Sequence, residues 1–199
     1  MIRLPALCAL LFLAACASGN DLDRPPVPLG EFVLGHNVVV APNLTKGPLS
    51  RDATKEEWIT AVKTAMGDRF GRYDGSQIYH IGLSVDGYVL AQPGIPLVLA
   101  PKSVVIVNVT VFDDATGKKL NETAEQLSVV EAFGSGAVVG SGYTQSREQQ
   151  LEGLAVRIAK EVEIWLDKEH RQNGWFKKRP APATALTEDG GDLPATAAE

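Results

Sequence analysis

The chain has 199 residues, of which 45% are hydrophobic and 22% charged, and its formal net charge is -5. This composition is typical of a globular protein with one packed core. The negative charge leaves no basic surface for a nucleic acid, so we expect no nucleic-acid partner.

The first fifteen residues have the pattern of an export signal. Arg3 provides a positive start, residues 4–13 are apolar apart from Pro5, and small residues then lead to Cys16. A positive start, a short apolar stretch and a small-residue end are typical of a cleaved signal peptide. The apolar stretch has about half of the ~20 residues that a membrane-spanning helix needs. We therefore expect residues 1–15 to be removed.

The end of this signal, Leu13-Ala14-Ala15-Cys16, resembles the lipobox of bacterial lipoproteins. The resemblance implies that the lipoprotein signal peptidase cuts before Cys16 and that acyl chains are attached there. Because two or three acyl chains hold a protein on a membrane firmly, the protein would be anchored without spanning the bilayer. In that family the alanine at position 17, where aspartate would retain the protein at the inner membrane, favours the outer membrane, facing the periplasm. The alternative is a plain secretory signal with a chance cysteine.

The two ends of the mature chain differ from its middle in composition. Cys8 lies in the removed signal, so lipidated Cys16 would be the last cysteine and no disulfide is expected. Residues 16–30 are polar and then proline-rich, which predicts a flexible tether. Residues 180–199 are rich in Ala, Pro, Thr and acidic residues and predict a disordered tail. Residues 31–179 remain as a single domain.

Hydrophobic periodicity predicts the elements of this domain in chain order. A valine-rich strand covers residues 32–41, although Gly35-His36-Asn37 interrupts it. Thr54 and Glu57 form a capping box before a helix that can end at Gly71. Alternating residues predict strands over 79–89 and 103–112, and after a turn at 113–118 a returning strand covers 120–132. A second capping box, Ser146 to Gln149, begins a long helix that Asn173-Gly174 can end.

The predicted fold class is α+β, with the element order β-α-β-β-β-α. Each helix has one apolar face that must pack against another apolar surface. The simplest arrangement is a two-layer sandwich, in which a mainly antiparallel sheet of about four strands carries both helices on one face.

This order of elements, over residues 32–170, resembles the small α/β sandwiches of envelope lipoproteins such as the lipopolysaccharide-assembly lipoprotein. The resemblance implies the sandwich fold and an accessory role in envelope assembly. That family typically has a glycine- and aromatic-containing stretch after its lipidated cysteine, where this chain has Ala17-Ser18-Gly19-Asn20. No binding residues are therefore carried over.

Three segments are candidates for partner contact. The loop at 91–102 is unusually apolar for a connection, and such patches often mark partner or membrane surfaces. The loop at 134–142 is glycine-rich but lacks the residues of a phosphate-binding loop, which favours a flexible connection or a partner-binding loop. Trp175 and Phe176 precede three basic residues and either contact lipid headgroups or fold back on the core. The candidate contact residues are Ile95, Leu97, Val98, Leu99, Gly134, Gly136, Trp175 and Phe176.

No catalytic, cofactor-binding or metal-binding motif is recognisable, so we expect no cofactor and no bound metal. The histidines at positions 36, 80 and 170 fall on separate elements without the spacing of metal ligands. The leading hypothesis is a non-enzymatic envelope lipoprotein that acts as an accessory or assembly factor and binds a protein or lipid component of the envelope. The alternatives are a cell-wall hydrolase or other envelope enzyme, and a purely structural lipoprotein. Carboxylates clustered in a pocket with His80 or His170 would favour an enzyme.

Overall fold

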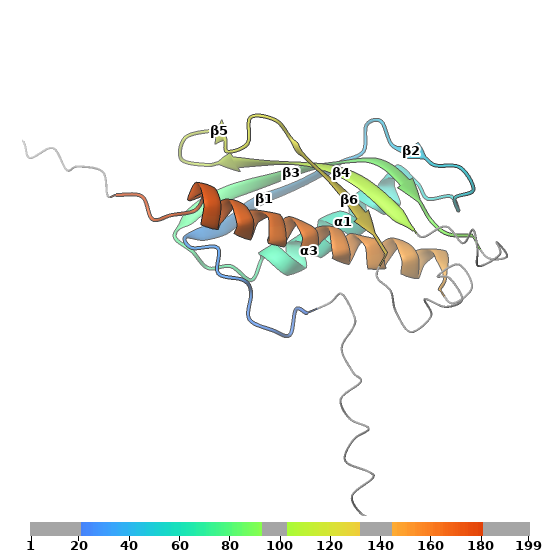
Figure 1. The fold of residues 1–199 in the computed structure, drawn as a ribbon, viewed down its shortest axis with the longest axis horizontal. Helices are drawn as coiled ribbons and strands as arrows, with labels where there is room; N and C mark the ends of the chain where they lie inside the picture. The colour runs from blue at the N-terminus through green and yellow to red at the C-terminus, as the bar shows by residue number, and fades with distance from the viewer. Residues whose placement is uncertain (1–20, 93–102, 132–144, 181–199) are drawn as a thin grey trace, which may run out of the picture.

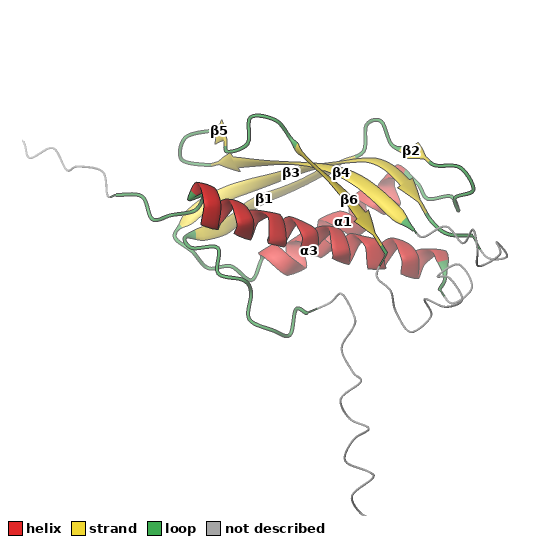
Figure 2. Cartoon of the chain, viewed as in Figure 1, coloured by secondary structure: helices red, strands yellow, loops and turns green. Residues whose placement is uncertain are grey.

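A computed structural model describes residues 21–92, 103–131 and 145–180. Its elements are β1 (Phe32–Val40), β2 (Thr45–Lys46), α1 (Lys55–Phe70), β3 (Gln77–Val89), β4 (Val104–Asp113), β5 (Lys118–Lys119), β6 (Glu125–Val130) and α3 (Arg147–Asn173). Both helices cover the same face of one sheet, so the expected two-layer α+β sandwich is confirmed (Figures 1 and 2). Within the described residues, no helix is long and apolar enough to cross a bilayer.

The sheet is mixed: most of its pairing is antiparallel, as expected, but β1 and β2 pair in parallel with β3, which was not foreseen. β1 pairs in parallel with β3, whereas β3 pairs antiparallel with β4, and β4 pairs antiparallel with β6. The physical reason lies in the chain order, because β1 and β3 are joined through α1. A helix that crosses over the sheet returns the chain to the end at which the first strand began, so the two strands run in the same direction.

Among the described residues the sheet has six strands, whereas about four were predicted. Of the predicted strand over 120–132, residues 125–130 form β6, while the short β5 lies before it at residues 118 and 119, and Asn121 separates the two. The Asn121 Oδ1 accepts a hydrogen bond from the Val111 N–H at 2.9 Å, and its Nδ2 donates to the Val109 carbonyl at 2.9 Å. The side chain therefore takes the place of a backbone partner of β4 at this point. The other additional strand, β2, pairs in parallel with residues 87 and 88 of β3.

Strand alternation places the core between the sheet and the helices. The inward side chains of β3 and β4 are aliphatic or aromatic, with exposed fractions of 3% or less: Tyr79, Ile81, Leu83, Val85, Val105, Val107, Val109 and Val111. Their neighbours along each strand point to the opposite face of the sheet. The interruption expected in the first strand is confirmed as a register shift between Leu34 and Asn37.

The helix ends form where the sequence predicts them. Thr54 and Ser146 each cap a helix through a complete capping box with the residue three positions later. The helix α3 ends at Gly174, whose φ of 71° lies in the left-handed region that glycine adopts without strain. The two helices run in the same direction, since Glu57 contacts Arg147 at their beginnings and Arg69 contacts Glu163 further along.

The second half of the predicted tether packs against the domain. Leu29 is 1% exposed and belongs to the core. Gly30 has a φ of 67°, and a Cβ at this position would lie 2.7 Å from the Phe176 carbonyl oxygen, so the close approach requires glycine. Leucine burial among aromatic residues offsets the entropy of ordering the segment. Cys16 and the other residues of the signal and the tail beyond residue 180 lie outside the described residues.

Candidate functional site

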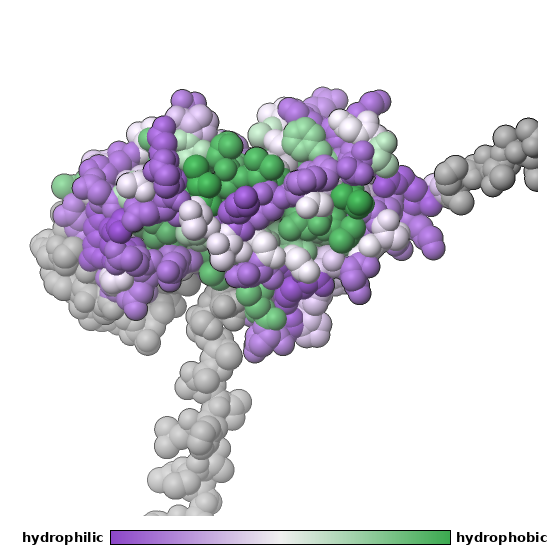
Figure 3. Space-filling view, turned by 180° about the vertical axis from the view of Figure 1, so that it is seen from behind, coloured by the Kyte–Doolittle hydropathy of each residue, from purple (hydrophilic) through white to green (hydrophobic). Residues whose placement is uncertain are grey.

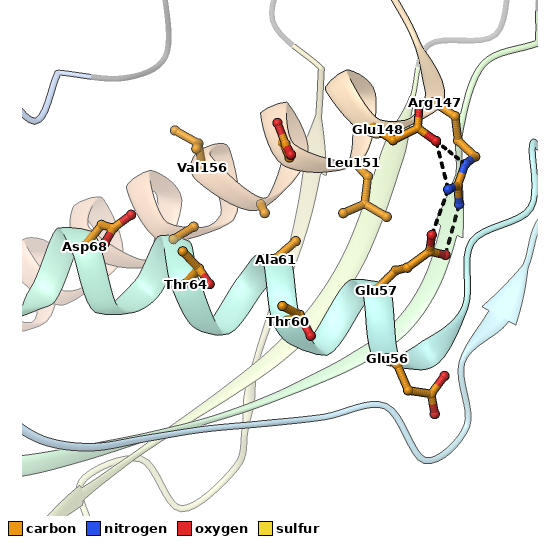
Figure 4. A pocket seen from close by; sticks show the side chains of 13 residues that line it. Glu56, Glu57, Thr60, Ala61, Thr64, Asp68, Arg147, Glu148, Leu151 and Val156 are labelled. Carbon is orange, nitrogen blue, oxygen red and sulfur yellow. Dashed lines mark hydrogen bonds and ion pairs between the residues drawn. The ribbon is translucent and has the colours of Figure 1, made fainter.

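A groove of about 620 Å³ runs between most of α1, from Glu56 to Asp68, and the first part of α3, from Arg147 to Val156. It opens on the side of the helices that faces away from the sheet (Figure 4). Its floor is apolar and made mainly of small side chains, including Ala61, Ala65, Leu151, Ala155 and Val156. Small residues at facing positions leave space between two helices, and here that space is open to solvent. The groove can therefore accept an apolar side chain or a short amphipathic segment.

The rim of this groove is strongly acidic. Five carboxylates and a single cation line it, namely Glu56, Glu57, Asp68, Glu148, Glu152 and Arg147. The guanidinium of Arg147 lies 2.7 Å from a Glu57 carboxylate oxygen and 2.8 Å from one of Glu148, as the dashed lines in Figure 4 show. Because five carboxylates stand against one cation, the rim carries a net negative charge. This charge favours a basic ligand.

The Glu57–Arg147 pair gives the groove mouth a defined pH dependence. Hydrogen bonds from Arg147, together with one from the Thr54 N–H, lower the pKa of Glu57 from 4.5 to about 2. Since the folded-state pKa is below the unfolded one, this carboxylate stabilises the fold fully above pH 4.5, and the stabilisation is lost as the pH falls towards 2.

We therefore expect the Glu57→Gln variant to lack this part of the pH dependence. The difference in free energy of unfolding between wild type and variant should shrink as the pH is lowered from 4.5 to about 2. Denaturant titrations at a series of pH values measure it. A difference that stays constant over this range would contradict the assigned contact.

A cluster of buried charges lies further along the same two helices. Glu163 and Arg69 are each 1% exposed. The Glu163 carboxylate accepts hydrogen bonds from Arg69 at 2.7 Å, from the Tyr73 hydroxyl at 2.9 Å and from Lys160 at 3.1 Å, and a longer one from Arg72 at 3.4 Å. Burial and the neighbouring Glu163 carboxylate raise the pKa of Tyr73, so its hydroxyl stays a donor. The cluster joins α1 to α3.

Two histidines that the sequence placed on separate elements meet on the open face of the sheet. The rings of His36 and His80 have centroids 4.7 Å apart. His80 Nδ1 accepts a hydrogen bond from the His36 N–H at 2.9 Å, and His80 Nε2 lies 2.9 Å from an Asp114 carboxylate oxygen. Both nitrogens of the His80 ring are therefore occupied by the protein itself, so the ring has no free nitrogen to accept a substrate proton.

Other titratable groups do not form a recognisable catalytic or metal centre in the parts of the chain that the structure describes. There, no three His, Cys, Asp or Glu side chains are arranged to hold a metal ion. His170 contacts the Trp175 carbonyl oxygen and stacks near Phe176. These contacts give His170 a structural role at the end of α3.

The structure brings the sequence-predicted contact residues to different places. Phe176 is 2% exposed and packs against Phe32 and Tyr79, so it folds back on the core and is not available as a surface contact. Trp175 is partly buried against the same core. The candidates Ile95, Leu97, Val98, Leu99, Gly134 and Gly136 lie outside the described residues.

The groove itself was not predicted from the sequence. Its rim acids are ordinary surface residues of two helices that are about ninety positions apart in the sequence. The capping boxes predict where these helices begin, but not that the helices lie side by side. A further apolar surface lies on the open face of the sheet, where Val38, Ile78, Ile106 and Val130 are exposed by 36% to 53%. A space-filling view of one side of the molecule shows apolar areas divided by polar ones (Figure 3).

Comparisons with known proteins give distant structural likenesses. No family model and no curated protein matches the chain. A protein of Caulobacter crescentus with a provisional lipoprotein name is 14% identical, with a TM-score of 0.37, and the match covers 70% of this chain and 93% of that one.

Two further structures are similarly remote. A Xanthomonas campestris protein of the family DUF330 is 12% identical, with a TM-score of 0.40 and coverage of 75% and 93%. A minor lipoprotein of Acinetobacter baumannii is 15% identical, with a TM-score of 0.29 and coverage of 64% and 93%. Two of these three neighbours bear lipoprotein names, and likenesses this remote assign no role to this chain.

Proposed function

We propose that this chain is a non-enzymatic lipoprotein, anchored through lipid on Cys16, that binds a basic amphipathic segment of another envelope protein. The observation that carries the binding role is the groove between α1 and α3, with its apolar floor and acidic rim. The anchor and the export signal are supported by the lipobox, and Ala17 favours the periplasmic side of the outer membrane. An accessory or assembly factor is the kind of protein that this combination suits.

The chemistry of the groove favours a protein segment over a small substrate. An enzyme needs a nucleophile or an acid–base pair that converges on a cleft. Glu57 and Arg147 are instead paired with each other at the groove mouth. A helix or extended segment with apolar residues on one side and Lys or Arg on its flanks would bury the floor and complement the rim.

Photo-crosslinking in cells tests this proposal directly. A photoreactive amino acid at Thr60 or Thr64, which line the groove, should join the protein to one envelope partner. The same amino acid at Glu122, an exposed loop position, is the matched control. Mass spectrometry of the crosslinked peptide should identify a basic amphipathic segment. Crosslinks to acidic segments, or equal yields from Thr60 and Glu122, would overturn the proposal.

Charge reversal on the rim gives a quantitative prediction. The double variant Asp68→Lys/Glu152→Lys should bind a synthetic Lys/Leu amphipathic peptide about tenfold more weakly than wild type. The reason is that two exposed attractions of a few tenths of a kcal/mol each become repulsions of similar size, about 1.4 kcal/mol in all. Isothermal titration calorimetry on the full mature chain measures the affinity. The control double variant Glu122→Lys/Glu125→Lys has the same net charge and exposed positions, and it should retain wild-type affinity.

A further inference from the structure

The chain just after the expected lipidation site is held on the helices by three cations. The Asp21 carboxylate lies 2.7 Å from the Arg69 guanidinium and 2.7 Å from the Lys160 ammonium. Arg72 donates to the Leu22 carbonyl oxygen at 3.1 Å and to the Arg24 carbonyl oxygen at 2.8 Å. Both the side chain and the backbone of residues 21–24 are thus fixed. We call this set of contacts, made by Asp21, Leu22, Arg24, Arg69, Arg72 and Lys160, the clasp.

The clasp is built on the buried cluster and not on mobile surface chains. Arg69 is 1% exposed and is held on its other side by Glu163, and Lys160 also contacts Glu163. Its cations are therefore already positioned when Asp21 binds, which lowers the entropic cost of each contact. Hydrogen bonds from Lys160 and Arg69 hold the pKa of Asp21 well below its usual range, so the carboxylate is charged at neutral pH.

We propose that the clasp is a membrane-orienting device that holds the helical layer of the domain against the lipid bilayer. The inference rests on the proposed lipidation of Cys16. Five residue steps separate Cys16 from Asp21, and they reach at most about 18 Å in a fully extended chain. If the whole stretch 16–30 were free, the reach would be about 50 Å and the domain could present any face. The clasp thus shortens the free chain between the lipid anchor and the domain. It also determines which face of the domain lies nearest the bilayer.

The selected side is the outer surface of the helices. The first described residues leave the molecule on the helical side, opposite to the exposed face of the sheet (Figure 1). Ile164, one helical turn after Lys160 on α3, is 48% exposed, and Lys168 follows one turn later and is exposed as well. These two residues lie beyond the acidic groove, whose lining stops at Asp68 and Val156. An exposed apolar side chain with an exposed ammonium group one turn away suits the boundary between acyl chains and headgroups.

A pair of isoleucine positions on opposite sides of the domain provides the test. Ile164 lies on the outer surface of the helices, whereas Ile106 on β4 is 36% exposed on the far face of the sheet. Each is replaced by cysteine in the full-length lipidated protein, whose mature chain would have no other free thiol. A fluorophore is attached to each cysteine. The labelled proteins are then placed in vesicles of phosphatidylethanolamine and phosphatidylglycerol that carry a headgroup-attached quencher of the fluorescence. We expect clear quenching at position 164 and little at position 106.

Breaking the clasp should abolish this contrast. The double variant Asp21→Ala/Arg72→Ala removes the carboxylate that two cations hold and the guanidinium that holds two backbone carbonyls, while Asp23→Ala removes only an exposed carboxylate nearby. We expect the difference between positions 164 and 106 to be lost in the double variant and kept in Asp23→Ala. Equal quenching at both positions in the wild type, or a contrast that survives the double variant, would overturn the inference.

Failure of the anchor is distinguished by a separate measurement. Mass spectrometry of the amino-terminal peptide shows whether Cys16 carries acyl chains, and circular dichroism shows that both alanine variants are folded. An unlipidated Cys16 refutes the anchor on which the proposed function depends. A lipidated Cys16 without the quenching contrast refutes the orientation alone, and the groove remains open to its own tests.

Discussion

The Glu163→Ala variant should lose about 3–5 kcal/mol of its free energy of unfolding, because the substitution removes the buried carboxylate that faces Arg69 and leaves this cation only the more exposed Asp21. Arg69 is 1% exposed, and Glu163 is the carboxylate that faces it inside the helix pair. The Tyr73 hydroxyl would lose its acceptor at the same time. A typical domain has about 5–15 kcal/mol of stability, so the expected loss is a large part of the total.

Urea denaturation of the mature chain measures this effect, and a second variant isolates the role of burial. Glu161 lies two positions earlier on α3 and contacts Arg157 at 3.5 Å, with both side chains about one third exposed. The Glu161→Ala variant should lose less than about 1 kcal/mol, since exposed ion pairs contribute little. Equal effects of the two substitutions would contradict this and show that Asp21, which already contacts Arg69 at 2.7 Å, is a sufficient partner for it.

The parts of the fold that follow from local sequence were predicted correctly. Thr54 and Ser146 have side chains that cap a helix only if a suitable residue follows three positions later, and this condition can be read directly from the chain. The alternating pattern that begins at Tyr79 and the apolar run after Ser103 likewise predict β3 and β4.

Strand direction could have been predicted and was not. The order strand, helix, strand over residues 32–89 is that of a crossover unit, which favours parallel pairing of β1 with β3. The division of the last strand was harder to foresee. It depends on Asn121, whose amide side chain forms the hydrogen bonds that the backbone of a continuous strand would form.

Neither the groove nor the buried charge cluster could be predicted, because the residues that form each of them are distant in sequence. Asp21, Arg69 and Glu163 are read separately as surface charges, and only folding brings them together in a buried cluster. For the same reason the flexible tether was predicted to extend to residue 30. Composition shows that residues 21–30 are polar and proline-rich. It does not show that Arg69, Arg72 and Lys160 on the helices bind this segment.

The Phe176→Ala variant should also lose about 3–5 kcal/mol of its free energy of unfolding, the usual cost of removing a buried aromatic side chain. The Phe176 ring lies 5.0 Å from the Phe32 centroid and 4.7 Å from that of Tyr79, and the residue is 2% exposed. Its backbone has a φ of 60°. Phenylalanine and alanine are both disfavoured there, so the strain cancels in the comparison and the lost packing remains.

This prediction separates the two roles that the sequence allowed for the aromatic pair after α3. A residue that only contacts headgroups would leave the free energy of unfolding within about 0.5 kcal/mol when replaced, and it would weaken membrane binding instead. Both quantities can be measured on a soluble Cys16→Ser variant, in which no acyl chain contributes to vesicle binding. We expect Phe176→Ala to lower stability without changing vesicle binding, because the ring completes the aromatic core between β1, β3 and the end of α3.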